Sequence, residues 1–315
     1  MNHALHPMKT NRFGRTFRIA LMSVAAAILA TLHCKANSEM RNWTYTSGET
    51  LRAELVSVDE AKQSVRLRSD KGTETVLPTA QLSTLDRAWV LEWVEMGEEL
   101  EALVKKLGGR IDHHEGKGAT MVTGFHVYHP SGEITPGTQR PLIVLFDPSG
   151  NPMRYLMRHL EAADQTKFTL VSCEVFRNSL DDKEGLDRFK DVLPVILQTV
   201  PHDPKRIFLG GTSGGALRAF DLSAAVKETP WAGIYSNGGW LGGSKNYNLP
   251  YPSQMRVAMV NGDKDIAANS WMDGDCTALK NRGITISVMA FEGGHQIPPV
   301  SVQAKAFKWL LKELE

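Results

Sequence analysis

The sequence has little cysteine and no excess of charge of either sign. Only three cysteines occur among 315 residues, and no two of them form a Cys-x-x-Cys pair. Three are too few for a disulfide scaffold, and the missing pair removes a common signature of a zinc site. Basic and acidic residues number 36 and 35, which gives a formal net charge of +1. A nucleic-acid binder needs a concentrated positive surface, so this balance argues against a nucleic-acid partner.

Long hydrophobic runs are also absent. The main apolar stretch covers residues 19–32, whereas roughly 20 apolar residues are needed to span a bilayer. The composition, 42% hydrophobic and 23% charged, is that of a globular protein and excludes a mostly disordered chain. At roughly 150 residues per domain, the length suggests about two domains.

The N-terminus is basic and then apolar, which is typical of a secretory signal peptide. Residues 1–36 contain no acid and five cations, namely Lys9, Arg12, Arg15, Arg18 and Lys35. We expect cleavage after Ala36, because Cys34 and Ala36 place small residues at the required spacing. The alternatives are an uncleaved N-terminal anchor and a lipidated Cys34, although His33 fits a lipobox poorly. Without the leader, 31 basic and 35 acidic residues remain, so the exported (periplasmic or secreted) protein has a net charge of −4.

Residues 41–107 read as short strands followed by a helix. Residues 51–58 and 65–68 alternate in part between apolar and polar side chains, and a turn follows at 70–72. Ser83 and Asp86 form a capping-box signature that opens an amphipathic helix. Gly108 and Gly109 end it. Its apolar residues recur at helical spacing: Leu85, Trp89, Trp93, Met96, Leu100, Leu103 and Leu107.

Residues 41–94 resemble the type-one Sla-homology domain, a small SH3-like β-barrel. The resemblance rests on Arg-Asn-Trp-Thr at 41–44, Gly48, the strands at 53–58 and 65–67, and the residues 77–78, 81–83 and 86. These are mostly structural positions. The match therefore implies a fold and a protein or surface ligand, with a purely packing role as the alternative. We interpret Trp89 and Trp93 as packing residues that join the helix to this domain.

Residues 108–119 read as a linker rich in glycine and charge. The adjacent His113 and His114 have no third ligand nearby, so we expect them to be solvated and predict no metal site.

From residue 120 to residue 315 the pattern changes to alternating strands and helices. We predict strands at 121–129, 141–146, 167–173, 206–210, 233–236, 256–260 and 285–290. The predicted helices are 153–163, 186–199, 214–227, 269–281 and 300–314. The runs at 142–146 and 207–209 are continuously apolar, as in strands covered on both faces. This alternation predicts an α/β fold, a mostly parallel sheet with helices on both faces.

The residues Gly211-Thr212-Ser213-Gly214-Gly215 fit the Gly-x-Ser-x-Gly pattern, directly after an apolar strand and before a helix. In that context the pattern predicts a nucleophile elbow. Small neighbours allow adjacent backbone to come close, and the following helix directs its positive end at the nucleophile. We expect the Gly214 amide to donate to an oxyanion. The alternative is a glycine-rich turn without chemistry.

A nucleophilic serine needs a base, and the base needs an orienting acid. His295 is the final histidine and follows Gly-Gly after the last predicted strand. Two carboxylates, Asp263 and Asp265, follow the strand at 256–260. We prefer Asp265 as the acid because Gly-x-x-Asp matches its usual place in this chain order. Asp263 is then a turn former.

Residues 120–315 resemble an α/β-hydrolase on these motifs. Residues 202–215 are similar to the Asp-Pro-x-Arg-strand-Gly-x-Ser-x-Gly-Gly stretch of secreted polyhydroxybutyrate-depolymerase and feruloyl-esterase-like enzymes. Those enzymes usually carry His-Gly after the oxyanion-loop strand, whereas this chain has Asp147-Pro148-Ser149. The alignment implies that the Ser149 amide is the second oxyanion donor, and Pro148 in place of glycine puts the loop geometry in doubt.

The predicted function is therefore a secreted serine hydrolase that cleaves carboxylic esters through Ser213, His295 and Asp265, without metal or organic cofactor. A serine peptidase of the same fold is one alternative. A catalytically degenerate interaction protein is another, and the Asp147-Pro148 loop favours it. Trp240, in a glycine-rich loop, is either a wall of the substrate site or an ordinary packed side chain. Cys173 and Cys276 can pair in an oxidising compartment, but we expect both to lie in core elements. The oligomeric state is left open.

Overall fold

The computed structural model describes residues 40–114, 124–132, 139–173, 176–178 and 180–312. The predicted leader at 1–36 lies outside these ranges, as do residues 115–119 of the predicted linker, residues 121–123 of the first predicted strand and the end of the last predicted helix. In the part described, no helix is long and apolar enough to cross a membrane.

Residues 41–78 form a four-stranded antiparallel sheet in the order of the chain. Its strands are β1 (Arg41–Thr44), β2 (Thr50–Asp59), β3 (Ser64–Ser69) and β4 (Glu74–Pro78), and the turn η1 (Thr79–Gln81) follows. Alternate side chains point inward, among them Trp43, Leu55 and Leu67, which are fully buried. The predicted strands of this segment are present, and its SH3-like identity stays a prediction.

The helix α1 (Thr84–Leu107) begins and ends where the sequence predicts. The Ser83 hydroxyl accepts a hydrogen bond from the Asp86 amide and donates one to the Asp86 carboxylate. Gly108 ends the helix with a φ of 70°, a left-handed conformation that glycine adopts at no steric cost.

One face of α1 covers the small sheet. Trp89 meets Trp43 edge to face, with ring centroids 5.4 Å apart, and Trp93 packs against the same core. The packing role predicted for both tryptophans is thus confirmed. Leu85, which the helical periodicity assigned to the apolar stripe, is instead 82% exposed. It lies in the first turn, where Asp86 turns toward Arg41.

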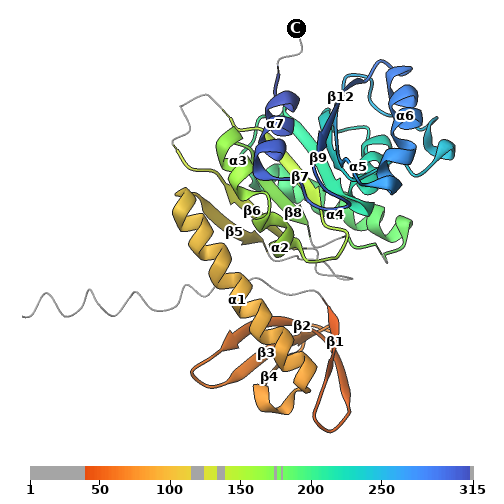
Figure 1. The fold of residues 1–315 in the computed structure, drawn as a ribbon. Helices are drawn as coiled ribbons and strands as arrows, with labels where there is room; N and C mark the ends of the chain where they lie inside the picture. The colour runs from red at the N-terminus through yellow and green to blue at the C-terminus, as the bar shows by residue number, and fades with distance from the viewer. Residues whose placement is uncertain (1–39, 115–123, 133–138, 174–175, 179, 313–315) are drawn as a thin grey trace, which may run out of the picture. The chain divides into compact units, whose positions relative to one another are not determined.

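The larger sheet has eight strands in the order β12-β11-β10-β9-β7-β8-β6-β5 (Figure 1). The strands β7 to β12 pair in parallel, whereas β5 and β6 pair antiparallel at one edge. Their bounds are β5 (Arg110–His114), β6 (Phe125–His129), β7 (Leu142–Phe146), β8 (Thr169–Cys173), β9 (Ile207–Thr212), β10 (Trp231–Asn237), β11 (Arg256–Gly262) and β12 (Thr285–Phe291). The predicted mostly parallel α/β sheet is confirmed.

Helices cover this sheet, and the alternation of its buried side chains separates two cores. Leu142, Val144 and Phe146 of β7 face a core shared with α4, α5 and α6. On the other side, Phe208 of β9 meets Phe168, which in turn meets Phe307 of α7. The helices are α2 (Pro152–Met157), α3 (Leu160–Thr166), α4 (Asp182–Thr199), α5 (Gly214–Ala225), α6 (Ile266–Lys280) and α7 (Val300–Leu310), with the turn η2 (Ser244–Asn246).

Two features of the predicted organisation need correction. Residues 110–114, expected as linker, form the edge strand β5, in which His113 stacks on His126 and His114 on Phe125. The histidines are therefore held in a sheet and are not solvated loop residues. The helix predicted at 153–163 is two helices, α2 and α3, with a break at Arg158 and His159. Neither residue is glycine or proline, so periodicity did not mark the break.

Cys173 of β8 and Cys276 of α6 are both buried. They lie in core elements, and Cys276 Sγ contacts Met259 Sδ at 3.4 Å.

Candidate active site

Ser213 lies on a sharp turn between β9 and α5. Its backbone has φ 55° and ψ −121°, which is strained for any residue that carries a Cβ. The Ser213 amide donates to the carbonyl of Asn237 at the end of β10, at 2.9 Å, which holds the turn beside the neighbouring strand. The turn thus places the serine at the carboxyl end of the parallel strands, where such sheets bind ligands.

The glycines of the motif allow backbone segments to approach closely. A Cβ on Gly211 would lie 2.4 Å from the carbonyl carbon of Gly215, so the end of β9 and the first turn of α5 would separate. A Cβ on Gly215 would lie 2.0 Å from the carbonyl oxygen of Phe146, at the end of β7. Both distances are far inside van der Waals contact. The turn therefore requires glycine on each side of Ser213.

His295 and Asp265 form a hydrogen-bonded pair. His295 Nδ1 and Asp265 Oδ2 are 2.7 Å apart, and the Asp265 side chain is only 2% exposed. The other oxygen, Oδ1, accepts from the Ala268 amide as the N-cap of α6, which fixes the carboxylate. The neighbouring Asp263 instead accepts from the Gly293 amide at 2.9 Å. Of the two predicted acids, the structure pairs Asp265 with the histidine and uses Asp263 to close the turn.

Ser213 and His295 line one cavity of about 390 Å³. Its other lining residues come from the loop after β7, from α2, from the loop after β8 and from the residues around His295: Asp147, Pro148, Ser149, Arg154, Tyr155, Arg158, Asn178, Thr212, Gln296 and Ile297. The cavity therefore collects side chains from the ends of several strands that lie far apart in sequence.

The loop after β7 is organised by the carboxylate of Asp147. Oδ1 accepts from the Ser149 amide at 3.1 Å, and Oδ2 accepts from the Ser149 hydroxyl and the Asn151 amide. The Ser149 amide was predicted as the second oxyanion donor. In this structure the amide donates to Asp147 Oδ1, and its role as an oxyanion donor stays a prediction.

A network of buried hydrogen bonds lies next to Ser213. The hydroxyls of Tyr155 and Thr212 are 2.8 Å apart, and Asn237 Nδ2 donates to Thr212 Oγ1 at 2.9 Å and to the Gln296 carbonyl at 3.2 Å. Burial raises the pKa of Tyr155, so its hydroxyl stays protonated. This hydrogen-bond network connects α2, the residue before Ser213 and the residue after His295.

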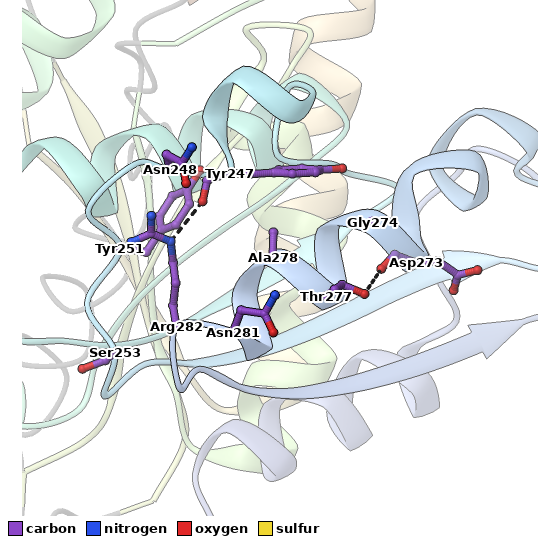
Figure 2. Close-up of a pocket in the computed structure, with 10 residues that line it drawn as sticks. All are labelled: Tyr247, Asn248, Tyr251, Ser253, Asp273, Gly274, Thr277, Ala278, Asn281 and Arg282. Carbon is purple, nitrogen blue, oxygen red and sulfur yellow. Dashed lines mark hydrogen bonds between the residues drawn. The ribbon is translucent and has the colours of Figure 1, made fainter.

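A second hollow lies away from the serine. A hollow of about 910 Å³ lies between the loop at residues 247–253 and α6, where Arg282 Nε donates to the Tyr247 carbonyl at 3.0 Å (Figure 2). It shares no lining residue with the cavity of Ser213. Trp240, predicted as a substrate-site residue, lines neither of these two hollows.

Sequence reasoning missed six residues of the Ser213 cavity: Arg154, Tyr155, Arg158, Asn178, Gln296 and Ile297. The signal for the first three was Asn151-Pro152, a helix start directly after the predicted oxyanion loop. Asn178 had no comparable signal. Among the residues described, no group of three or more His, Cys, Asp or Glu side chains is arranged to hold a metal ion.

No family model and no curated protein matches the sequence. Solved structures do match the fold. The esterase LipW from Mycobacterium marinum has a TM-score of 0.54 at 14% identity, covering 69% of this chain and 85% of its own. An esterase from Pyrobaculum calidifontis has a TM-score of 0.53 at 11% identity, covering 69% and 90%. Esterase E25 has a TM-score of 0.52 at 15% identity, covering 69% and 82%.

These identities are low, so the likeness concerns the fold. It agrees with the eight-stranded mixed sheet and with a serine on the turn between β9 and α5. The larger part of this chain has the α/β-hydrolase fold.

Proposed function

We propose that the protein is a serine hydrolase that cleaves carboxylic esters, with Ser213 as nucleophile, His295 as base and Asp265 as the orienting acid. The observation that carries the proposal is the His295–Asp265 hydrogen bond of 2.7 Å beside a cavity that Ser213 and His295 both line. The fold likeness to solved esterases supports the same class of reaction.

The proposed reaction is acyl transfer in two halves. Ser213 Oγ attacks the ester carbonyl while His295 Nε2 takes the serine proton, and Asp265 holds Nδ1–H so that Nε2 is the basic nitrogen. The tetrahedral intermediate then collapses, and His295 returns the proton to the departing alcohol. Water attacks the acyl-enzyme by the same route and releases the acid.

The Gly214 amide is the proposed oxyanion donor. Gly214 is the first residue of α5, and the first amides of a helix have no carbonyl partner within it. The positive end of the helix adds to the stabilisation of the developing charge. One such donor contributes on the order of 3 kcal/mol to the transition state.

A fluorophosphonate probe tests the proposal. We expect covalent labelling of the folded protein and no labelling of Ser213→Ala, whereas Ser270→Ala, an exposed serine on α6, is labelled like the wild type. Absence of labelling in folded wild-type protein would refute the proposal of a serine hydrolase and favour an interaction protein. Aryl esters beside chromogenic peptides would then separate an esterase from a peptidase.

We also propose export and a docking role for the N-terminal sheet. Export rests on the basic and apolar residues 1–36, and processing is tested by sequencing the N-terminus of protein recovered outside the cytoplasm. The docking role rests on the resemblance of residues 41–94 to an SH3-like module. The specific likeness to polyhydroxybutyrate-depolymerase and feruloyl-esterase-like enzymes belongs to the same set of proposals and rests on residues 202–215.

A further inference from the structure

We propose that the substrate is an ester that also bears a carboxylate, and that Arg158 and Arg154 bind this anionic group. The inference deepens the proposed function and depends on it. Both arginines line the cavity of Ser213 and His295. They are four residues apart on α2 and its C-cap, so they lie on the same side of that short helix.

The acidic side chain in the cavity does not neutralise them. Asp147 is 5% exposed, and its two oxygens accept three hydrogen bonds from its own loop. Its charge is thus directed at backbone and hydroxyl groups of that loop. A ligand in the cavity meets two guanidinium groups and no exposed carboxylate of the lining.

The two arginines differ in how they are held. Arg154 pairs with Glu92 of α1 at 3.2 Å, with the two side chains 48% and 59% exposed, so the pair is weak and can be exchanged for a ligand. Arg158 is exposed and makes no ion pair within the described part of the chain. A guanidinium presents several donors in one plane and binds carboxylates in a bidentate manner. Arg158 is therefore the principal contact and Arg154 the second.

The positive charge of the cavity lining contrasts with the overall charge of the protein. Without the leader the chain has a net charge of −4. A positive cavity is then a local feature and not a part of a generally basic surface. It would attract anionic esters and raise their rate of encounter at low salt.

The test compares charged and neutral esters of matched length. In the first pair, mono-4-nitrophenyl adipate and 4-nitrophenyl hexanoate, the charged member carries its carboxylate in the acyl part. In the second pair, 4-acetoxybenzoate and its methyl ester, the charged member carries it in the alcohol part. Wild-type protein should show a higher kcat/KM for the charged member of one pair. Arg158→Gln should lower kcat/KM for the charged ester about ten- to a hundredfold. The change should be mainly in KM, because the contact exists before and during the reaction.

Controls separate this proposal from the proposed function. Arg158→Lys should retain part of the preference, and Arg52→Gln, an exposed arginine of β2, should retain all of it. Arg52→Gln should hydrolyse neutral esters like the wild type, and the loss in Arg158→Gln should be at least about tenfold larger on the charged ester than on its neutral partner. If neutral esters are hydrolysed but neither charged ester is preferred, the anionic substrate is refuted while the hydrolase stands. If no ester is hydrolysed and the phosphonate does not label, the hydrolase itself fails.

A different observation points to a second oxyanion donor, and we infer that it is the side-chain amide of Asn178. This amide lies over Gly214: a Cβ on Gly214 would be 2.0 Å from Asn178 Oδ1 and 3.4 Å from Nδ2. The backbone N–H of Asn178 donates to the Pro148 carbonyl at 2.9 Å, which ties Asn178 to the loop after β7. Because the terminal amide torsion is broad, rotation presents Nδ2 beside the Gly214 amide.

Removing that donor should lower kcat and leave KM nearly unchanged, since the oxyanion exists only in the transition state. We expect Asn178→Ala and Asn178→Leu each to lose about a hundredfold in kcat on a neutral ester. Asn178→Gln should restore part of the loss, and Asn248→Ala, an exposed residue beside the other hollow, should behave like the wild type. A kcat within about twofold of wild type in both Asn178 variants would overturn the assignment.

Discussion

At the scale of single residues, the site depends on which carboxylate the histidine meets. Two aspartates follow β11, and spacing ranked them without excluding either. The burial of Asp265 and its two hydrogen bonds, to His295 and to the Ala268 amide, distinguish it from the exposed Asp263. A buried carboxylate held at both oxygens keeps one orientation, which is what an orienting acid requires.

This difference predicts unequal effects of two matched substitutions. Asp265→Asn should lower kcat by three to four orders of magnitude, because an amide favours the wrong imidazole tautomer. Asp263→Asn should lower kcat by less than about tenfold, because an amide oxygen still accepts from Gly293. Steady-state hydrolysis of an aryl ester measures both. The opposite ranking would make Asp263 the acid.

The strained backbone of Ser213 predicts a conflict between stability and activity. This conformation is unfavourable by on the order of 1–3 kcal/mol for a residue with a Cβ, whereas it is only slightly unfavourable for glycine. We expect Ser213→Gly to be more stable than Ser213→Ala by about 1 kcal/mol or more, and both to be inactive. Chemical denaturation of the two variants is the measurement. Equal stabilities would show that the turn stores no strain.

At the scale of elements, the helix α1 was predictable from its ends. Ser83 and Asp86 at its start and Gly108 after its last residue are local signals, because capping hydrogen bonds form within one turn of the chain. The strands β7 and β9 were predictable for a related reason, since a strand covered on both faces must be apolar throughout. The break between α2 and α3 was not, because it depends on how two helices pack on the sheet.

The cap of α1 predicts a local loss of stability. Ser83→Ala removes the hydroxyl that accepts from the Asp86 amide and donates to its carboxylate. The free energy of unfolding should fall by about 1 kcal/mol. Ser270→Ala, whose hydroxyl only bonds back to the Ala267 carbonyl within α6, should change it by less than about 0.5 kcal/mol. Similar losses in both variants would contradict the capping role.

At the scale of the whole molecule, a buried histidine couples the fold to pH. His159 is fully buried between α2 and α3, and its Nδ1 donates to the Tyr155 carbonyl at 2.8 Å. A further proton on Nε2 would place a charge in the core. Burial accordingly lowers the pKa of His159 to about 4.

The unfolded chain binds this proton near pH 6.5, whereas the folded protein binds it only near pH 4. Stability from His159 is therefore complete above pH 6.5 and falls as the pH decreases toward 4. The total loss is about 3 kcal/mol, because each pH unit between the two pKa values contributes about 1.36 kcal/mol. His159→Gln should lack this component, so denaturation midpoints measured from pH 7 to pH 4 should decline less steeply in the variant. Parallel declines would refute the coupling.

The sequence by itself determined the features that depend on neighbouring residues. These are the alternation of strands and helices, the ends of α1, and the serine turn with its two required glycines. Only the tertiary structure decided which groups meet across the ends of different strands: Asp265 with His295, and Arg158 and Asn178 with the cavity of Ser213. Such contacts join segments that lie far apart in the sequence, and no local hydrogen bond or periodicity records them. The near-neutral composition likewise concealed a positive cavity, because net charge carries no information on where the charges lie.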